Sequence, residues 1–415
     1  MVVQSATLAV NERMEARRAA GKPVLHLGFG EAGLPVLPAV GRVLAEAVHC
    51  NRYGAVAGSA AARAAAAGYF ARRGVPTEPD QIVFGPGSKP LLFALISATP
   101  GDVILPQPSW VSYAAQAALA GKRVLRVRVP ESSGGVPDPD QLAYVLAGIN
   151  GDRKPGLMVL TLPDNPTGRL ASRAEVDKVC SLAAEYDITV VCDEIYRDLV
   201  FAPEGFTSPV ELLPDDCVVT TGLSKSMALG GWRVGFARFP DSLLGRRLRH
   251  EVVGVASEIW SGLAEPMQVA ATYVLGEPAE VTAHVQACRQ LHRRVVTAVA
   301  DELVQAGARC ATPQSGFYVY PDFAPLQPRL ARAGVSSGAA LAEHLLERHG
   351  VGVLAGEAFG DDPDALRFRA ATSLLYGADD EQRWAALGSD EPTSLPWITD
   401  ALAQLREALG SLAAL

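Results

Sequence analysis

The sequence predicts an α/β fold with a mainly parallel central sheet, helices on both faces and a smaller α+β domain. From about Val75 onward, short β-branched segments alternate with helix-length amphipathic segments, as in consecutive βαβ units. Two of the strand segments, residues 157–162 and 188–192, are apolar runs. Apolar runs are typical of parallel strands that are buried on both faces.

The alternation defines the elements of the larger domain in chain order. We expect strands at residues 81–87, 102–106, 122–130, 156–163, 188–196, 217–225 and 233–239. Helices are expected at residues 58–68, 88–98, 109–121 and 172–187, where the apolar positions follow a helical period or alanine dominates. The helix at 88–98 carries Pro90 in its first turn, where a proline is tolerated.

The C-terminal third has a different pattern. Residues 241–307 are helical in pattern with an interruption near 276–278, and a strand region follows at 308–323. We then expect a helix at 337–350, a strand at 366–375 and an amphipathic helix at 396–409. The predicted division is an N-terminal arm with part of the small domain (1–45), a large domain (46–290) and a small C-terminal domain (291–415).

Composition narrows the class of protein. The chain has 415 residues, 49% hydrophobic and 20% charged, and a net charge of −8 without a basic block, so nucleic acid and anionic membranes are not expected partners. The six cysteines form no CxxC motif, which predicts reduced thiols and no metal site. No signal-peptide pattern or membrane-spanning run is present. These features predict a cytoplasmic enzyme.

Polar residues follow several of the predicted parallel strands. Asn165 comes after one strand, Asp193 and Tyr196 end the next, and Lys225 ends a third. Ligands of open parallel sheets bind beyond these strand ends, so the side chains are expected to meet there. Each has a simple alternative: "DNPTG" is turn chemistry, an Asp at a strand end often caps a helix, and Lys225 beside Ser224 is a weak sign of Ser/Lys hydrolysis.

Taken together and in this order, the motifs resemble those of the fold-type I pyridoxal-phosphate enzymes, most closely the class I/II aminotransferases of the aspartate aminotransferase superfamily. The most specific motifs are "NPTG" at 165–168, "DEIY" at 193–196 and "SKSMALGGWRVG" at 224–235. The resemblance extends from "LGFGEAG" near residue 30 to "LRFRAATS" near residue 370. It implies a transaminase that moves an amino group between an L-amino acid and a 2-oxo acid in two half-reactions.

The resemblance also implies how pyridoxal 5′-phosphate is held. Lys225 would form the Schiff base and transfer the substrate proton, Asp193 would pair with the ring nitrogen, and Arg233 would bind the phosphate. The full set of implied cofactor contacts is Gly87, Ser88, Lys89, Trp110, Asn165, Asp193, Tyr196, Ser224, Arg233 and, from the neighbouring subunit, Tyr53. The contribution of Tyr53 implies a homodimer with shared active sites.

Substrate contacts follow in the same way. Arg367 is expected to bind the substrate α-carboxylate in preference to Arg369, which lies two residues further along the same predicted strand. Gly30 fits the N-terminal segment that covers the substrate. No second arginine for a distal carboxylate is evident, and Phe29, Leu34 and Trp260 are candidates for an apolar pocket, so the amino acid used is not identified.

The sequence departs from the family pattern at two points. Gly222 stands where a phosphate-binding serine is common, so Ser224 or Thr221 is expected to supply that hydroxyl. Asp164 stands where Asn or Ser is commoner. Glu265 and Pro266 lie in a stretch that often approaches the partner's active site in the family.

Two alternatives share parts of this pattern. A lyase, cyclase or decarboxylase on the same scaffold would use the same lysine, aspartate and arginine set, because the cofactor supplies the carbanion chemistry. A ligand-sensing domain of a transcription regulator would need a DNA-binding domain ahead of the fold, and the resemblance already begins at about Val24. We therefore expect a transaminase.

Overall fold

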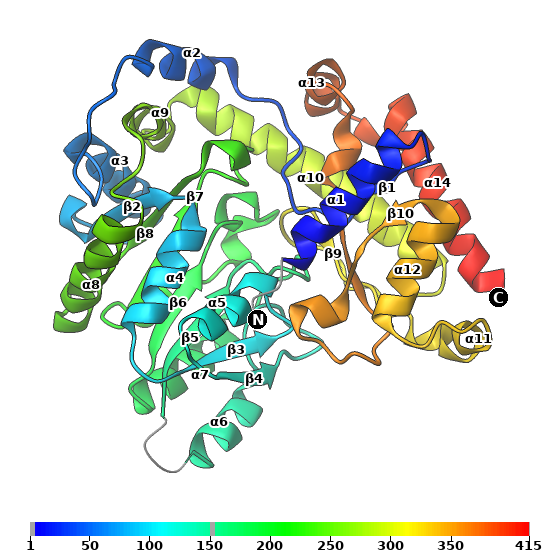
Figure 1. The fold of residues 1–415 in the computed structure, drawn as a ribbon, viewed down its shortest axis with the longest axis horizontal. Helices are drawn as coiled ribbons and strands as arrows, with labels where there is room; N and C mark the ends of the chain where they lie inside the picture. Colours follow the sequence, from blue (N-terminus) through cyan, green and yellow to red (C-terminus); the bar gives the residue numbers. More distant parts are fainter. Residues whose placement is uncertain (1–4, 150–153, 415) are drawn as a thin grey trace.

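A seven-stranded sheet forms the centre of the larger domain in the computed structural model, which describes residues 5–149 and 154–414 (Figure 1). Its spatial order is β2-β8-β7-β6-β5-β3-β4. The strands are β2 (Ile82–Pro86), β3 (Asp102–Gln107), β4 (Val124–Arg128), β5 (Pro155–Thr161), β6 (Thr189–Asp193), β7 (Cys217–Gly222) and β8 (Val234–Arg238). Only β8 runs antiparallel to its neighbours, β2 and β7. The mainly parallel sheet is therefore confirmed.

Helices cover both faces of this sheet, as the alternation predicted. The alternate residues of β6 separate the two faces: Val190 and Cys192 pack with α7 (Arg173–Glu185), while Val191 packs with α4 (Ser88–Ala98) and α8 (Leu243–Ile259). The other helices of this domain are α2 (Pro38–Ala47), α3 (Ala60–Ala71), α5 (Val111–Leu119), α6 (Pro139–Ala147) and α9 (Glu265–Leu275).

The smaller part has its own core around short strands. Its three-stranded antiparallel sheet has the order β11-β12-β9, and β1 pairs with β10 beside it. The strands are β1 (Leu25–His26), β9 (Tyr318–Val319), β10 (Val351–Gly352), β11 (Leu354–Ala355) and β12 (Phe368–Ala371). The helices around them are α1 (Ala6–Ala19), α10 (Ala279–Gln305), α11 (Gln327–Arg332), α12 (Gly338–His349), α13 (Asp380–Gly388) and α14 (Pro396–Ala414).

The division of the core supports two domains joined by α10. Val281 near the start of α10 belongs to the core of the large sheet, whereas Leu291 and Leu303 belong to the core of the small part. The predicted boundary at residue 290 thus falls inside a continuous helix, and the boundaries themselves remain predictions. Figure 1 shows α1 and α14 at opposite ends of the chain but in the same small part.

Two segments differ from the sequence prediction. The helical stretch 241–307 breaks at residues 260–264 as well as near 276–278, because Ser261 (φ 60°) and Gly262 (φ 142°) leave the helical conformation. The strand expected at 308–323 is reduced to Tyr318–Val319. Among the described residues, no helix is long and apolar enough to cross a membrane.

Candidate active site

A pocket of about 590 Å³ lies at the C-terminal ends of β5, β6 and β7 and at the start of α4. This is the position that the parallel sheet predicts for a ligand. The sequence-predicted residues that line it are Gly30, Ser88, Lys89, Trp110, Asn165, Asp193, Tyr196, Ser224, Lys225 and Arg233. The fold therefore brings together residues that the sequence separates by as much as two hundred positions.

One end of the pocket is positively charged. Ser88 and Lys89 form the first turn of α4, where unpaired N–H groups and the helix dipole favour an anion. Arg233 reaches the same turn, and a Cβ at Gly87 would lie 2.2 Å from its Nη2 atom. Gly87 also has a φ of 85°, a conformation that favours glycine, and a side chain there would displace the Arg233 guanidinium.

The charges at this end have no carboxylate partner among the described residues, since Lys89, Lys225 and Arg233 form no salt bridge there. Partial burial, with the nearby Arg233 and Lys225, lowers the pKa of the Lys89 ammonium. Three cations that repel one another are expected to bind a multiply charged anion. This end fits the phosphate of pyridoxal 5′-phosphate.

The floor of the pocket carries a buried carboxyl group. Asp193 is only 3% exposed, and burial raises its pKa to about 7. Tyr113 donates a hydrogen bond to Oδ2 at 3.2 Å, and the backbone N–H of Ile195 donates to Oδ1 at 3.3 Å. A buried carboxylate with no cation in contact fits the protonated ring nitrogen of the cofactor.

Lys225 lines the same pocket as the cationic end and Asp193. Its Nζ atom donates a hydrogen bond to the carbonyl oxygen of Gly30 and lies 6.0 Å from the ring centroids of Tyr196 and Phe317. Among the described residues, no carboxylate forms an ion pair with this amine. Its place in the pocket fits the lysine that would form a Schiff base with the cofactor.

The local structure near Lys225 explains why Gly222 stands where the family pattern often has a serine. A Cβ at Gly222 would lie 2.4 Å from the carbonyl oxygen of Val234, so this position has no space for a serine. Ser224 lines the pocket, whereas the hydroxyl of Thr221 donates to the carbonyl of Glu194 at 3.3 Å. Of the two predicted candidates, only Ser224 is placed to contact a ligand.

The structure places a different arginine in the pocket from the one expected to bind the substrate carboxylate. Arg369, not Arg367, lines the pocket with Lys225. Arg369 is 1% exposed, donates to Asn165 Oδ1 at 3.1 Å and to the carbonyl of Gly28 at 2.9 Å, and its Nε atom is buried without a partner. A buried guanidinium with no carboxylate among the described residues is suited to receive one from a substrate.

Arg367 is neutralised in a different cavity. It forms salt bridges to Asp322 at 3.0 Å and to Asp361 at 3.4 Å. With two carboxylates in contact, it has little attraction left for a third. Arg367 immediately precedes β12 and Arg369 lies within it, so the two arginines have different surroundings although they are only two residues apart.

Several lining residues were missed by the sequence analysis. The hydroxyl of Tyr318 lies 2.8 Å from that of Tyr196, and its ring centroid lies 4.6 Å from the Arg369 guanidinium carbon. Thr161 and Tyr113 line the floor and share a hydrogen bond of 2.7 Å. Thr161 ends β5 as Asp193 ends β6, so its place at a strand end was the available signal.

Some residues that the sequence predicted at the site lie outside the Lys225 pocket. Tyr53 is 97% exposed and borders a separate hollow with Trp260, Glu265 and Pro266, so it makes no contact with the pocket of its own chain. Phe29 lines the pocket but Leu34 and Trp260 do not.

Asp164 has a local structural role beside the pocket. It is buried outside the pocket lining, and its Oδ2 atom accepts hydrogen bonds from the Thr167 hydroxyl at 2.5 Å and from the Thr167 N–H at 3.3 Å. It stabilises the turn that carries Asn165.

Comparison with known proteins adds independent information. The family model "Aminotransferase class I and II" matches residues 22–374. The aspartate/prephenate aminotransferase of Cereibacter sphaeroides is 32% identical over 91% of this chain and 94% of its own length. The aspartate aminotransferase of Geobacillus stearothermophilus is 30% identical over 89% and 92%, respectively. The solved aspartate aminotransferase of Thermus thermophilus with maleate has a TM-score of 0.80 at 29% identity and covers 93% of this chain and 96% of its own.

Proposed function

Because the chain belongs to the class I and II aminotransferases, which are pyridoxal-phosphate-dependent transaminases, we propose that the Lys225 pocket is its catalytic site. The names of the relatives do not favour the lyase, cyclase or decarboxylase alternative. The observation that carries the assignment is the convergence of Lys225, Asp193 and Arg233 with the carboxylate-free Arg369 in one pocket.

The residues of the pocket divide into contacts for each part of the cofactor. When bound, pyridoxal phosphate supplies an electron sink for the charge that forms at the substrate α-carbon. The proposed phosphate contacts are Ser88, Lys89, Ser224 and Arg233. The Asp193 carboxylate would pair with the ring nitrogen, and Asn165 and Tyr196 would hydrogen-bond the ring hydroxyl oxygen. Trp110, which lines the same pocket, would pack against the ring.

Arg369 orients the substrate. Its guanidinium donates to Asn165 and to the carbonyl of Gly28, and it packs on the rings of Tyr318 and Phe359. This fixed fork matches the two oxygens of an α-carboxylate. Binding of the carboxylate orients the α-carbon toward Lys225. The entropy of bringing the two groups together is then lost on binding and does not add to the barrier of the reaction.

Lys225 moves the proton. Its Nζ atom would bind the cofactor as a Schiff base and, as a free amine, would take the proton from the substrate α-carbon. The same amine would return a proton to complete the half-reaction. The contact to the Gly30 carbonyl keeps the free amine within the pocket, on the side of the N-terminal segment.

We further propose that the protein is a cytoplasmic homodimer. Aspartate is the first amino-group donor to test. The exposed Tyr53 supports the dimer, since it would need a partner's site to contact a phosphate. Relatives named for aspartate support the choice of donor.

The test is the Lys225→Ala variant with Lys178→Ala as control, since Lys178 is exposed on α7. We expect Lys225→Ala to remain folded by circular dichroism and to lose about 10²–10⁴-fold in transamination, while Lys178→Ala keeps wild-type turnover. Normal turnover in Lys225→Ala would remove this lysine from the reaction.

A further inference from the structure

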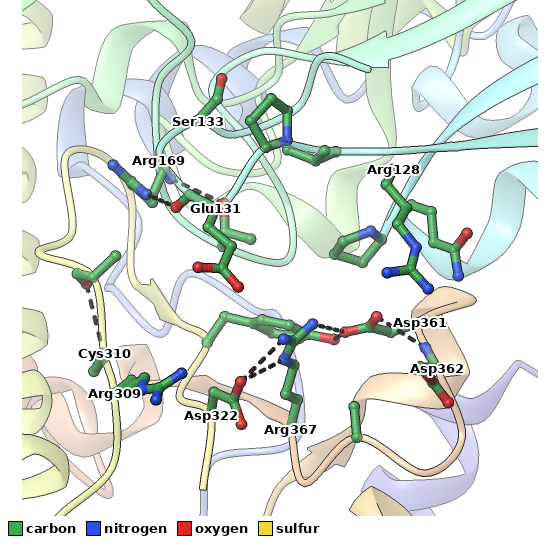
Figure 2. Close-up of a pocket in the computed structure, with 18 of the residues that line it drawn as sticks. Arg128, Glu131, Ser133, Arg169, Arg309, Cys310, Asp322, Asp361, Asp362 and Arg367 are labelled. Atoms are coloured by element: carbon green, nitrogen blue, oxygen red, sulfur yellow. Dashed lines mark hydrogen bonds and ion pairs between the residues drawn. The ribbon is translucent and has the colours of Figure 1, made fainter. Parts of the chain in front are cut away.

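A second cavity, of about 760 Å³, lies beyond the ends of β3 and β4 (Figure 2). One wall comes from the large domain and carries Arg128 and Glu131; the other comes from the small part and carries Arg309 and Asp362. It shares no lining residue with the Lys225 pocket. Arg367, just before β12, borders this cavity, and Arg369, within β12, borders the Lys225 pocket.

Main-chain hydrogen bonds join segments that adjoin the lining of this cavity. The N–H of Ser109 donates to the carbonyl of Phe359 at 3.0 Å. Elsewhere, the N–H groups of Gln314 and Ser315 both donate to the carbonyl of Gly168 at 3.0 Å. The cavity is therefore a formed feature of the fold, and its volume is in the range of small-molecule sites.

Some of its charges are already paired within the protein. Arg367 is bracketed by Asp322 and Asp361, and Tyr320 donates to Asp361 at 2.8 Å. Arg169 donates to the carbonyl oxygens of Glu131 and Ser132 at 2.6 Å each. These groups form the frame of the cavity and are not available to a ligand.

The remaining charges are of both signs and form no ion pair among the described residues. In residues 5–149 and 154–414, the guanidinium groups of Arg128 and Arg309 and the carboxylate of Glu131 make no ion pair or side-chain hydrogen bond. The Asp362 carboxylate accepts only the N–H of Asp364, at 3.0 Å. Figure 2 shows all four side chains around the same opening.

This charge distribution selects a class of ligand. The lining contains arginines (Arg128, Arg169, Arg309, Arg367) and a larger number of carboxylates (Glu131, Asp138, Asp322, Asp361, Asp362). A simple anion would meet a wall without net positive charge, and a simple cation would meet free guanidinium groups. A small zwitterion can pair with both signs at once.

We propose that this cavity binds a free α-amino acid as an intact zwitterion, with its carboxylate at the unpaired arginines and its ammonium at Glu131. The site is separate from the catalytic pocket, and its occupant undergoes no reaction there.

The experiment is equilibrium dialysis of the holoenzyme against each common radiolabelled L-amino acid in turn. The wild type is compared with Arg309→Gln/Glu131→Gln, with each single variant, and with Arg332→Gln, an exposed arginine on α11 outside the cavity. For at least one amino acid, the wild type and Arg332→Gln bind one mole per chain more than the double variant. Each single variant weakens that extra binding about tenfold or more, with transamination unchanged.

Equal stoichiometry in the wild type and the double variant for every amino acid overturns the proposal. Displacement of the bound amino acid by inorganic phosphate or acetate at equal concentration also overturns it, because the site would then recognise an anion alone. If the double variant does not fold, the two single variants decide, and unchanged affinity in both counts against the site.

Discussion

Arg367 lies just before β12 and Arg369 within it, and their neighbours determine what each can bind. Arg367 contacts two carboxylates, whereas Arg369 is buried beside the rings of Tyr318 and Phe359 with no carboxylate partner among the described residues. The sequence indicated that an arginine near this strand reaches the pocket, but it did not identify which of the two does so. Asp322 and Asp361, which settle the choice, come from segments whose approach to β12 is not visible in the local pattern.

We expect Arg369→Ala to raise the KM for both amino acid and 2-oxo acid by about 10²-fold or more, because a charge-assisted pair is lost. Cofactor binding is retained. The matched control, Arg367→Ala, keeps KM near the wild-type value. Steady-state kinetics with a cofactor titration measure both, and the reverse pattern would restore Arg367 as the carboxylate-binding residue.

Asp193 and Asp164 are both buried, and burial raises the pKa of each from 3.8 to about 7. The native state therefore keeps a proton that the unfolded chain has released above about pH 4. As a result, each group lowers the free energy of unfolding of the cofactor-free protein as pH rises from about 4 to about 7.

Asp193→Asn and Asp164→Asn should each stabilise the cofactor-free protein relative to wild type at pH 8, by on the order of 1–4 kcal/mol, and much less at pH 4. Denaturant unfolding at the two pH values measures this. With cofactor added, the two variants are expected to differ in activity: Asp193→Asn loses it and Asp164→Asn keeps it. A stability difference that does not depend on pH would contradict the burial of ionisable groups at these positions.

At the scale of elements, α1 carries residues of the catalytic pocket into place. Ser5, Thr7 and Leu8 at its start line the pocket. The helix is attached to the small part by Met14, which is fully buried against Gly352, and by the exposed salt bridge of Arg13 with Glu343. The packing contact and the ion pair are expected to differ in energy.

Met14→Ala should destabilise the protein by about 2–5 kcal/mol through the cavity it leaves, whereas Arg13→Ala should cost less than about 1 kcal/mol because both charges are about half exposed. Scanning calorimetry of the two variants gives the comparison. A larger loss for Arg13→Ala would mean that the ion pair, not the apolar contact, attaches the helix.

The elements themselves were largely predictable where the pattern is long. Helix α4 matches residues 88–98, and the strands of the large sheet fall inside their predicted ranges or within one residue of them. The short strands β1, β10 and β11 were not predicted, because two residues are too few to show a period. They pair through contacts between distant segments, which local sequence does not record.

At the scale of the molecule, the chain presents Tyr53 to solvent and away from its own pocket. In the proposed dimer this hydroxyl completes the partner's phosphate site. We expect chains of 43.7 kDa to sediment as a dimer and Tyr53→Phe to raise the cofactor Kd about tenfold. Tyr144→Phe, at another exposed tyrosine, should leave it unchanged. A monomer with full cofactor affinity would contradict the shared site.

The most direct test of the central claim is the absorbance spectrum of the holoenzyme during one half-reaction with aspartate. We predict that the visible band of the lysine-linked cofactor converts to the near-ultraviolet band of its amino form, that a 2-oxo acid restores it, and that Lys225→Ala shows neither change. Release of ammonia or carbon dioxide with the visible band unchanged, for aspartate and for the other common amino acids, would contradict transamination at Lys225.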